Sequence, residues 1–287
     1  MTKYDRIVDG IRYPLAIKDE ILEAVKTFEV REDDVWLITY RKSGTTWAQE
    51  ILIFLSCGCD LAKRDKIDIT ERISFLDLLK PGMTEFAHVT AAKKPSPRIM
   101  ETHMQSRHMP REIITKKPKI VYVARNPKDI AVSFYYFHKS NKLIKTFETW
   151  DEYFQAFYDG DLVGGSWFDM NLYWWNRRND DNVLFLKYED MKEDLGSVIV
   201  KISEFIGWPV PEGKLEEVVQ HCSFGNMKNN PKINYTESKM IDISISPFMR
   251  KGLVGDWKNY FTVSQNEAFD KLYEEKMKGS GLTFRFE

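Results

Sequence analysis

The feature of this sequence that most constrains its fold is an alternation between short apolar runs and stretches with helical apolar spacing. Short strands are expected at 35–40, 98–103, 119–125 and 183–188. Their apolar residues follow one another instead of alternating with polar ones, as is typical of strands buried on both faces of a parallel sheet. We therefore predict an α/β protein, a single domain over residues 1–287, with a central parallel sheet flanked by helices.

Helix boundary signals support this interpretation. Asn126 and Pro127 are typical of the N-cap and first helical position, and Gly207 follows a predicted helix at 195–206. Ligands of parallel α/β sheets bind at the carboxyl ends of the strands. These ends carry Arg41–Thr46, His103, Arg125 and Tyr188.

Charge and composition exclude several classes of partner. The 287 residues include 42 Lys and Arg against 43 Asp and Glu, a net charge of −1. Non-specific binding of nucleic acid or an anionic membrane needs a basic excess, so neither partner is expected. Three cysteines make no disulfide framework, and the N-terminus lacks the apolar segment of a signal peptide. We expect a cytoplasmic protein.

The loop at 41–47 has the chemistry of a phosphate cradle. Gly44 allows close backbone approach, a helix start offers free N–H groups, and Lys42 adds a positive charge. Ser43, Thr45 and Thr46 add hydroxyl donors. The spacing is not that of a Walker A loop, so no metal is expected. The alternative is an ordinary turn in which Thr46 caps the helix.

Four segments then resemble the cytosolic sulfotransferases, in family order. Thr39–Trp47 is similar to the family's 5′-phosphosulfate loop, and Arg125–Asp129 with Ala131–Ser133 to its 3′-phosphate motif. Lys187–Met191 and Phe248–Gly252, the latter continuing into 255–259, match further family segments. The resemblance implies that 3′-phosphoadenosine-5′-phosphosulfate (PAPS) is the co-substrate and that its product is the bisphosphate PAP, with a small, mostly apolar molecule as sulfuryl acceptor.

The resemblance also implies which residues bind the nucleotide. The 3′-phosphate would be bound by Arg125, Ser133, Arg250, Lys251 and Gly252, and the adenine by Trp47, Tyr188 and Phe224. With Cys222, where the family commonly has Thr, the implied set is Lys42, Ser43, Gly44, Thr45, Thr46, Trp47, Arg125, Ser133, Tyr188, Cys222, Phe224, Phe248, Met249, Arg250, Lys251 and Gly252.

Each of these positions also has a structural interpretation. Arg125 could instead form a helix-end salt bridge with Asp129. Arg250 and Lys251 could lie in a solvated loop, and the aromatic residues could pack in the core.

By the same resemblance, His103 is the candidate catalytic base and Lys42 stabilises the leaving phosphate during in-line transfer. Phe75 and Phe137 would flank the acceptor beside His103. The structural interpretation of His103 is a hydrogen-bonded core histidine.

Two departures from the family pattern fall near the reacting centre. Arg41 stands where Pro is usual, and Glu101 where Lys is frequent. Arg41 could replace the lost charge, or Glu101 could face an amine acceptor. A further alternative is a PAP- or PAPS-binding protein with little or no turnover, and a nucleotide kinase is the rival enzyme.

The C-terminal part carries a possible self-association motif. Lys258, Thr262, Val263 and Glu267 resemble the family's short dimerisation motif, which implies a weak homodimer. The segment 264–267 also predicts a capping box for the last helix.

Overall fold

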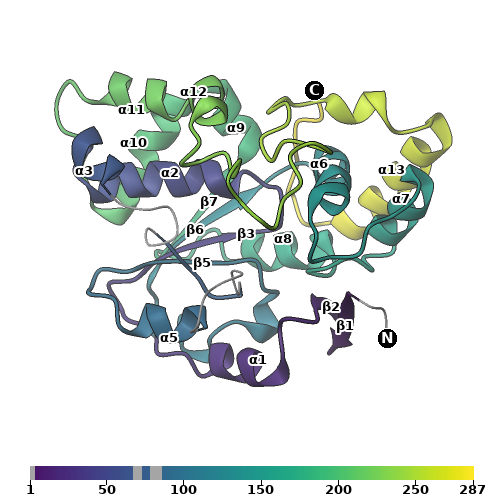
Figure 1. Ribbon diagram of the computed structural model, residues 1–287, viewed down its shortest axis with the longest axis horizontal. Helices are drawn as coiled ribbons and strands as arrows, with labels where there is room; N and C mark the ends of the chain where they lie inside the picture. The colour runs from purple at the N-terminus through teal and green to yellow at the C-terminus, as the bar shows by residue number, and fades with distance from the viewer. Residues whose placement is uncertain (1–3, 67–72, 78–85) are drawn as a thin grey trace.

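The computed structural model describes residues 4–66, 73–77 and 86–287. Its core is a sheet of five parallel strands in the order β4-β5-β3-β6-β7 (Figure 1). The strands are β3 (Val35–Thr39), β4 (Ser74–Phe75), β5 (Ile99–Thr102), β6 (Lys119–Ala124) and β7 (Val183–Lys187). The predicted parallel α/β architecture is confirmed, and β4 is an edge strand that the sequence did not reveal.

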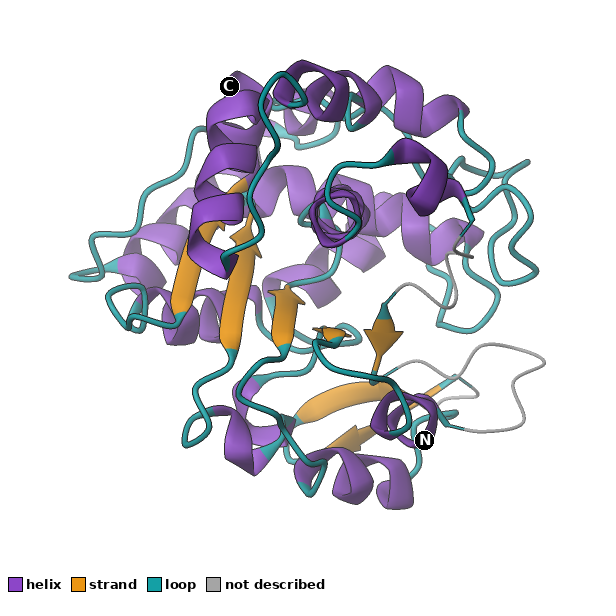
Figure 2. Cartoon of the chain, turned by 90° about the vertical axis from the view of Figure 1, so that its left-hand side faces the viewer, coloured by secondary structure: helices purple, strands orange, loops and turns teal. Residues whose placement is uncertain are grey.

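Helices cover both faces of the sheet (Figure 2). Leu37 packs into an apolar cluster with α2 (Thr45–Ser56) and α10 (Leu195–Ile206). Its neighbours Trp36 and Ile38 pack into a second cluster with α6 (Pro127–Ser140) and α8 (Trp167–Trp175). Successive strand residues point to opposite faces, which explains why every residue of β3 is buried and why this segment is apolar throughout.

The predicted helix boundaries of α6 and α10 are confirmed. The Asn126 side chain accepts a hydrogen bond from the Asp129 N–H at 2.8 Å, with Pro127 as the first residue of α6. Gly207 ends α10 in the left-handed region with φ of 76°. The Asn126 cap fixes where α6 begins, directly after the carboxyl end of β6.

The last helix, α13 (Val263–Met277), begins differently from the prediction. Thr262 is its N-cap and forms the capping box with Gln265, so the box predicted at 264–267 is wrong by two residues.

An antiparallel hairpin of β1 (Asp5–Val8) and β2 (Ile11–Pro14) precedes the sheet. The remaining described helices are α1 (Asp19–Lys26), α3 (Leu61–Asp65), α5 (Ala87–Ala92), α7 (Trp150–Tyr158), α9 (Tyr188–Glu193), α11 (Leu215–His221) and α12 (Phe224–Asn229), with 3-10 turns at Ser106–His108, Arg111–Ile113 and Asp256–Asn259.

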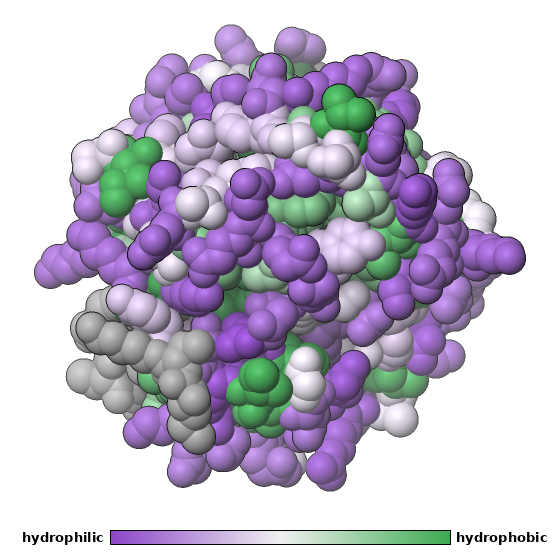
Figure 3. Space-filling model, turned by 90° about the vertical axis from the view of Figure 1, so that its right-hand side faces the viewer, coloured by the Kyte–Doolittle hydropathy of each residue, from purple (hydrophilic) through white to green (hydrophobic). Residues whose placement is uncertain are grey.

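The side of the molecule that carries α7 and α13 is largely hydrophilic, with apolar residues scattered over it (Figure 3). Within the described ranges, no helix combines the length and apolar character required to cross a bilayer.

Candidate functional site

The carboxyl ends of β3, β5, β6 and β7 meet at one cavity of about 250 Å³. The cavity collects nearly all of the residues singled out in the sequence. The lining members of that set are Lys42, Gly44, Thr45, Thr46, Trp47, Phe75, His103, Arg125, Ser133, Phe137, Tyr188, Phe224, Phe248, Met249, Arg250, Lys251 and Gly252. The position expected for a ligand in a parallel sheet is therefore where these side chains converge.

Two predicted residues lie outside the cavity lining. The Cys222 side chain is fully buried in the apolar cluster behind α2, and burial raises the pKa of its thiol well above the usual value. The thiol does not line the cavity, and its contact with the adenine stays a prediction. The Ser43 side chain is also fully buried, and its Oγ has no hydrogen-bond partner within the described part of the chain.

The turn between β3 and α2 presents backbone N–H groups to the cavity. Gly44 is the N-cap of α2 with φ of 96° and no side-chain cap, so the alternative in which Thr46 caps the helix is wrong. A Cβ at Gly44 would lie 2.7 Å from the Tyr188 ring, which explains why this position has no side chain. The first N–H groups of the 12-residue α2 remain available to an anion.

Lys42 is buried at this turn with its ammonium between aromatic rings. Its Nζ lies 4.2 Å from the ring centre of Phe248 and 4.8 Å from that of Phe137. No ion pair of Lys42 occurs among residues 4–66, 73–77 and 86–287. Burial, followed by the charges of Arg125 and Arg250, lowers the pKa of Lys42 to about 7. An anion placed here would gain a cation that carboxylates do not already neutralise.

Arg125 is positioned at the end of β6 by backbone carbonyls. Its guanidinium donates to Lys42 O at 3.2 Å and to Leu253 O at 3.0 Å, and it lies 4.2 Å from the centre of the Tyr188 ring. The buried Nε has no hydrogen-bond partner among the described residues. The guanidinium is held rigidly beside Lys42, as binding of a phosphate group requires.

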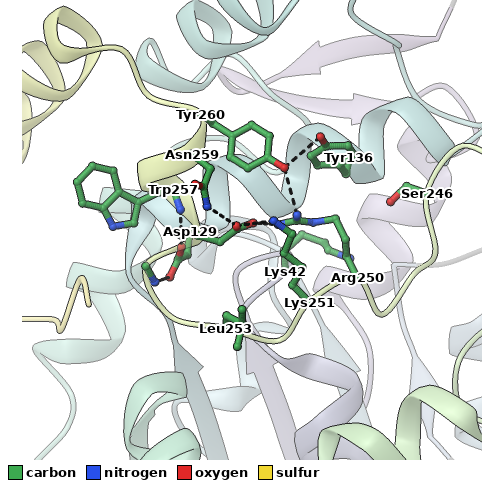
Figure 4. Close-up of polar contacts among 12 residues, drawn as sticks. Lys42, Asp129, Tyr136, Ser246, Arg250, Lys251, Leu253, Trp257, Asn259 and Tyr260 are labelled. Atoms are coloured by element: carbon green, nitrogen blue, oxygen red, sulfur yellow. Dashed lines mark hydrogen bonds and ion pairs between the residues drawn. The ribbon is translucent and has the colours of Figure 1, made fainter.

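Asp129 is not the partner of Arg125 that one interpretation of the sequence proposed. Its carboxylate accepts hydrogen bonds from the backbone N–H groups of Gly255 at 2.9 Å and Trp257 at 3.1 Å (Figure 4). These bonds join the first turn of α6 to the loop that carries Arg250 and Lys251. The cations from distant parts of the sequence are brought together in this way.

Arg250 and Lys251 share one carboxylate, which corrects the interpretation of a merely solvated loop. Asp256 lies 2.5 Å from Arg250 Nη2 and 2.6 Å from Lys251 Nζ (Figure 4). Although burial opposes it, hydrogen bonds from Lys251 and Arg250 lower the pKa of Asp256. The Tyr260 hydroxyl, 3.4 Å from Arg250 Nη1, further restricts the guanidinium.

His103 follows β5 and is held in one orientation. Its Nδ1 lies 2.9 Å from the Thr39 carbonyl oxygen and 3.0 Å from Thr39 Oγ1. Because the carbonyl oxygen can only accept, we assign the proton to Nδ1 and the lone pair to Nε2. The Phe75 ring packs against the imidazole edge-on, with ring centres 5.0 Å apart. Burial and then the charge of Arg41 lower the pKa of His103 to about 3. The imidazole is therefore neutral at physiological pH.

Two acidic residues complete the wall near His103. Glu101 is 2% exposed, its Oε1 lies 3.9 Å from His103 Nε2, and its Oε2 accepts a hydrogen bond from Gln49. Asp77 accepts a hydrogen bond from the His103 N–H at 3.1 Å and lies 3.5 Å from the Arg41 guanidinium. Burial raises the pKa of Asp77.

Other lining residues carried no sequence signal. Tyr235, with φ of 60°, packs on Phe248 with ring centres 4.4 Å apart, and Gln49 and Asp77 also reach the cavity. These residues come from a loop, a helix face and a strand end that no local pattern marks as functional.

Buried and rigidly held cations, the N–H groups of a helix start and a neutral histidine at the carboxyl edge of a parallel sheet define an anion-binding α/β enzyme. The model of the sulfotransferase domain family matches residues 32–281. Over 268 residues the chain is 42% identical to dog (Canis lupus familiaris) sulfotransferase 1A1, covering 93% of this chain and 90% of the relative. Human sulfotransferase 1C2 is 43% identical over 265 residues, with coverage of 92% and 89%.

A solved structure agrees with these relatives. Mouse sulfotransferase SULT7A1, complexed with PAP, is 33% identical with a TM-score of 0.80, and the match covers 96% of this chain and 95% of that one. The chain belongs to the sulfotransferase family. The prediction of a PAPS-dependent sulfotransferase is thereby confirmed at the level of the enzyme class, and the nucleotide-kinase alternative is wrong.

Proposed function

We propose that the cavity binds PAPS and transfers its sulfuryl group to a hydroxyl or amine of a small, mostly apolar acceptor, with His103 as base and Lys42 stabilising the leaving phosphate. The observation that carries the proposal is the location of the buried ammonium of Lys42 and the neutral imidazole of His103 on one cavity. The related mouse enzyme complexed with PAP supports the choice of nucleotide.

The two ends of the nucleotide have separate sets of partners in this proposal. The 3′-phosphate would be bound by Arg125, Ser133, Arg250, Lys251 and Gly252. Two of these residues, Arg250 and Lys251, also contact Asp256. The rings of Trp47 and Tyr188, whose centres lie 5.4 Å apart, would contact the adenine together with Phe224. The N–H groups at the start of α2, with Thr45 and Thr46, would bind the phosphosulfate.

The chemical step then follows from proton and charge movements. The acceptor atom attacks sulfur while the bond from sulfur to the bridging phosphate oxygen breaks. Lys42 neutralises the charge that develops on that oxygen, and His103 Nε2 takes the acceptor proton. Phe75 and Phe137 would hold the acceptor in the apolar part of the cavity. Nothing found in the fold or among the relatives favours the alternative of nucleotide binding without turnover.

Incubation with sulfur-labelled PAPS and a panel of phenols, alcohols, sterols and amines tests the proposal directly. We expect label transfer to at least one planar apolar acceptor and release of PAP in equal amount. Binding of PAP without transfer to any acceptor would contradict the proposed activity and favour the non-catalytic alternative.

Replacing Gly252 by Ala is expected to weaken PAP binding at least tenfold. Gly252 has φ of 65°, and a Cβ there would lie 2.4 Å from the Phe224 ring, so the ring or the loop beside the proposed 3′-phosphate site must move. Calorimetric titration with PAP measures the loss. Gly213→Ala is the matched control, because Gly213 has φ of 74° and a Cβ there meets nothing within 4 Å. Equal affinities in the two variants would refute the steric argument.

The weak homodimer and the cytoplasmic location remain predictions. Val263 is 78% exposed and Lys258 pairs with Glu287, so the segment proposed for dimerisation is accessible in the monomer. Sedimentation velocity over a range of concentrations, with Val263→Glu as the variant, tests the homodimer: a mass independent of concentration would contradict it.

A further inference from the structure

Glu101 and His103 place two hydrogen-bond acceptors on the same part of the cavity wall. They lie at the carboxyl end of β5, both line the cavity, and Glu101 Oε1 is 3.9 Å from His103 Nε2. Glu101 is one of the residues at which the chain departs from the family pattern. The geometry of this pair limits which acceptor group can react here.

Each acceptor is oriented by a neighbouring residue. The proton on His103 Nδ1 is committed to the Thr39 carbonyl, which leaves the Nε2 lone pair for the reacting group. Gln49 donates to Glu101 Oε2, which turns Oε1 toward His103. An atom within hydrogen-bond distance of Nε2 on the cavity side can therefore also reach Oε1.

A reacting group between two acceptors needs two hydrogens to satisfy both. A neutral primary amine has them, whereas a hydroxyl has one and would turn a lone pair toward the carboxylate. The apolar rings of Phe75 and Phe137 line the same cavity and suit a flat aromatic body. We propose that Glu101 makes this sulfotransferase selective for primary aromatic amines over the corresponding phenols. This inference rests on the proposed function.

The reaction of such an amine balances without a further reactant. The nitrogen lone pair forms the bond to sulfur, and the electron pair of the breaking S–O bond goes to the phosphate oxygen of the departing nucleotide. One N–H proton passes to His103 Nε2, and the other stays on the sulfamate product, donated to Glu101. Because nitrogen gains positive charge as the bond forms, the hydrogen bond to Glu101 strengthens in the transition state.

The test compares kcat/KM for 2-naphthylamine and 2-naphthol, two acceptors of the same shape, in the wild type, Glu101→Leu and Glu101→Gln. We expect the wild type to favour the amine. Leu removes the acceptor atoms, so the amine-to-naphthol ratio should fall at least tenfold, as for loss of one charged hydrogen bond. Gln keeps an acceptor without charge, so its ratio should lie between the other two. PAP affinity, measured in parallel, should stay within about twofold.

The outcomes separate this inference from the proposed function. A wild type that transfers to naphthol in preference to naphthylamine overturns the inference and leaves sulfuryl transfer intact. A ratio unchanged in Glu101→Leu likewise overturns it. Bound PAPS with no transfer to either compound, or to any member of the acceptor panel, overturns both. The wild-type ratio decides the question even if the Leu variant does not fold.

Discussion

His103→Ala is expected to lower sulfuryl transfer by about 10²–10⁴-fold, the usual contribution of a general base, with PAP affinity nearly unchanged. The imidazole lies next to Phe75, in the part of the cavity proposed to hold the acceptor. The proposed phosphate partners lie elsewhere in the chain: Arg125 follows β6, and Arg250 lies in the loop after α12. Removing it should therefore affect the chemical step and leave nucleotide binding intact. Steady-state transfer from labelled PAPS and a separate PAP titration measure the two effects.

The matched control is His88→Ala, because His88 is partly buried and does not line the cavity. Its activity should equal that of the wild type. Retention of more than a tenth of the wild-type rate in His103→Ala would remove His103 as the base.

The pH profile gives a second check on His103. Its pKa of about 3 means that the basic form is present above that pH and is lost only in strong acid. With a phenol acceptor, kcat/KM should therefore show no acid limb near the ordinary histidine pKa of 6.5. A limb at that pH would contradict the proposed state of the imidazole.

Lys42→Met should lower transfer by about 10²–10³-fold, the typical loss when one preorganised group that stabilises transition-state charge is removed. The ammonium carries no carboxylate partner among the described residues, so its charge is available to the bridging oxygen. Lys201→Met, at an exposed position of α10, is the control with unchanged activity expected. A rate within threefold of wild type in Lys42→Met would contradict the assignment.

The lowered pKa of Lys42 adds a pH dependence with a definite sign. In the ligand-free protein the cation is present below pH 7 and lost above it, because its pKa falls from 10.5 to about 7. PAP affinity should decline as pH rises above 7, with proton uptake on binding, since a bound anion favours the charged form. Calorimetry in buffers of different ionisation enthalpy measures this uptake. In Lys42→Arg the decline should disappear, because arginine stays charged.

Two interpretations of single residues failed for one physical reason. Thr46 does not cap α2, and Arg125 does not pair with Asp129. In each case the sequence pattern allowed a contact, and the side chain found a better partner or a buried position that involves a distant segment. The two-residue error at the start of α13 has a local origin, since Thr262 and Gln265 satisfy the capping box equally well by their spacing.

By itself the sequence determined the parallel sheet, the helix boundaries at Asn126 and Gly207, and the strand ends at which the candidate site residues stand. These properties depend on local periodicity and on backbone preferences that act over a few residues. Only the tertiary structure decided that Lys42 lies between Phe248 and Phe137 and that one carboxylate holds Arg250 and Lys251.

The separation of Glu101 from His103 likewise came only from the tertiary structure. Side chains of residues i and i+2 on a strand point to the same face, but the sequence does not say how the chain turns after the strand. The contact of His103 with Thr39, which lies 64 residues earlier in the chain, sets the imidazole, and Gln49 on α2 sets the carboxylate. Partners so far apart in the sequence meet only because the parallel sheet brings its strand ends to one edge.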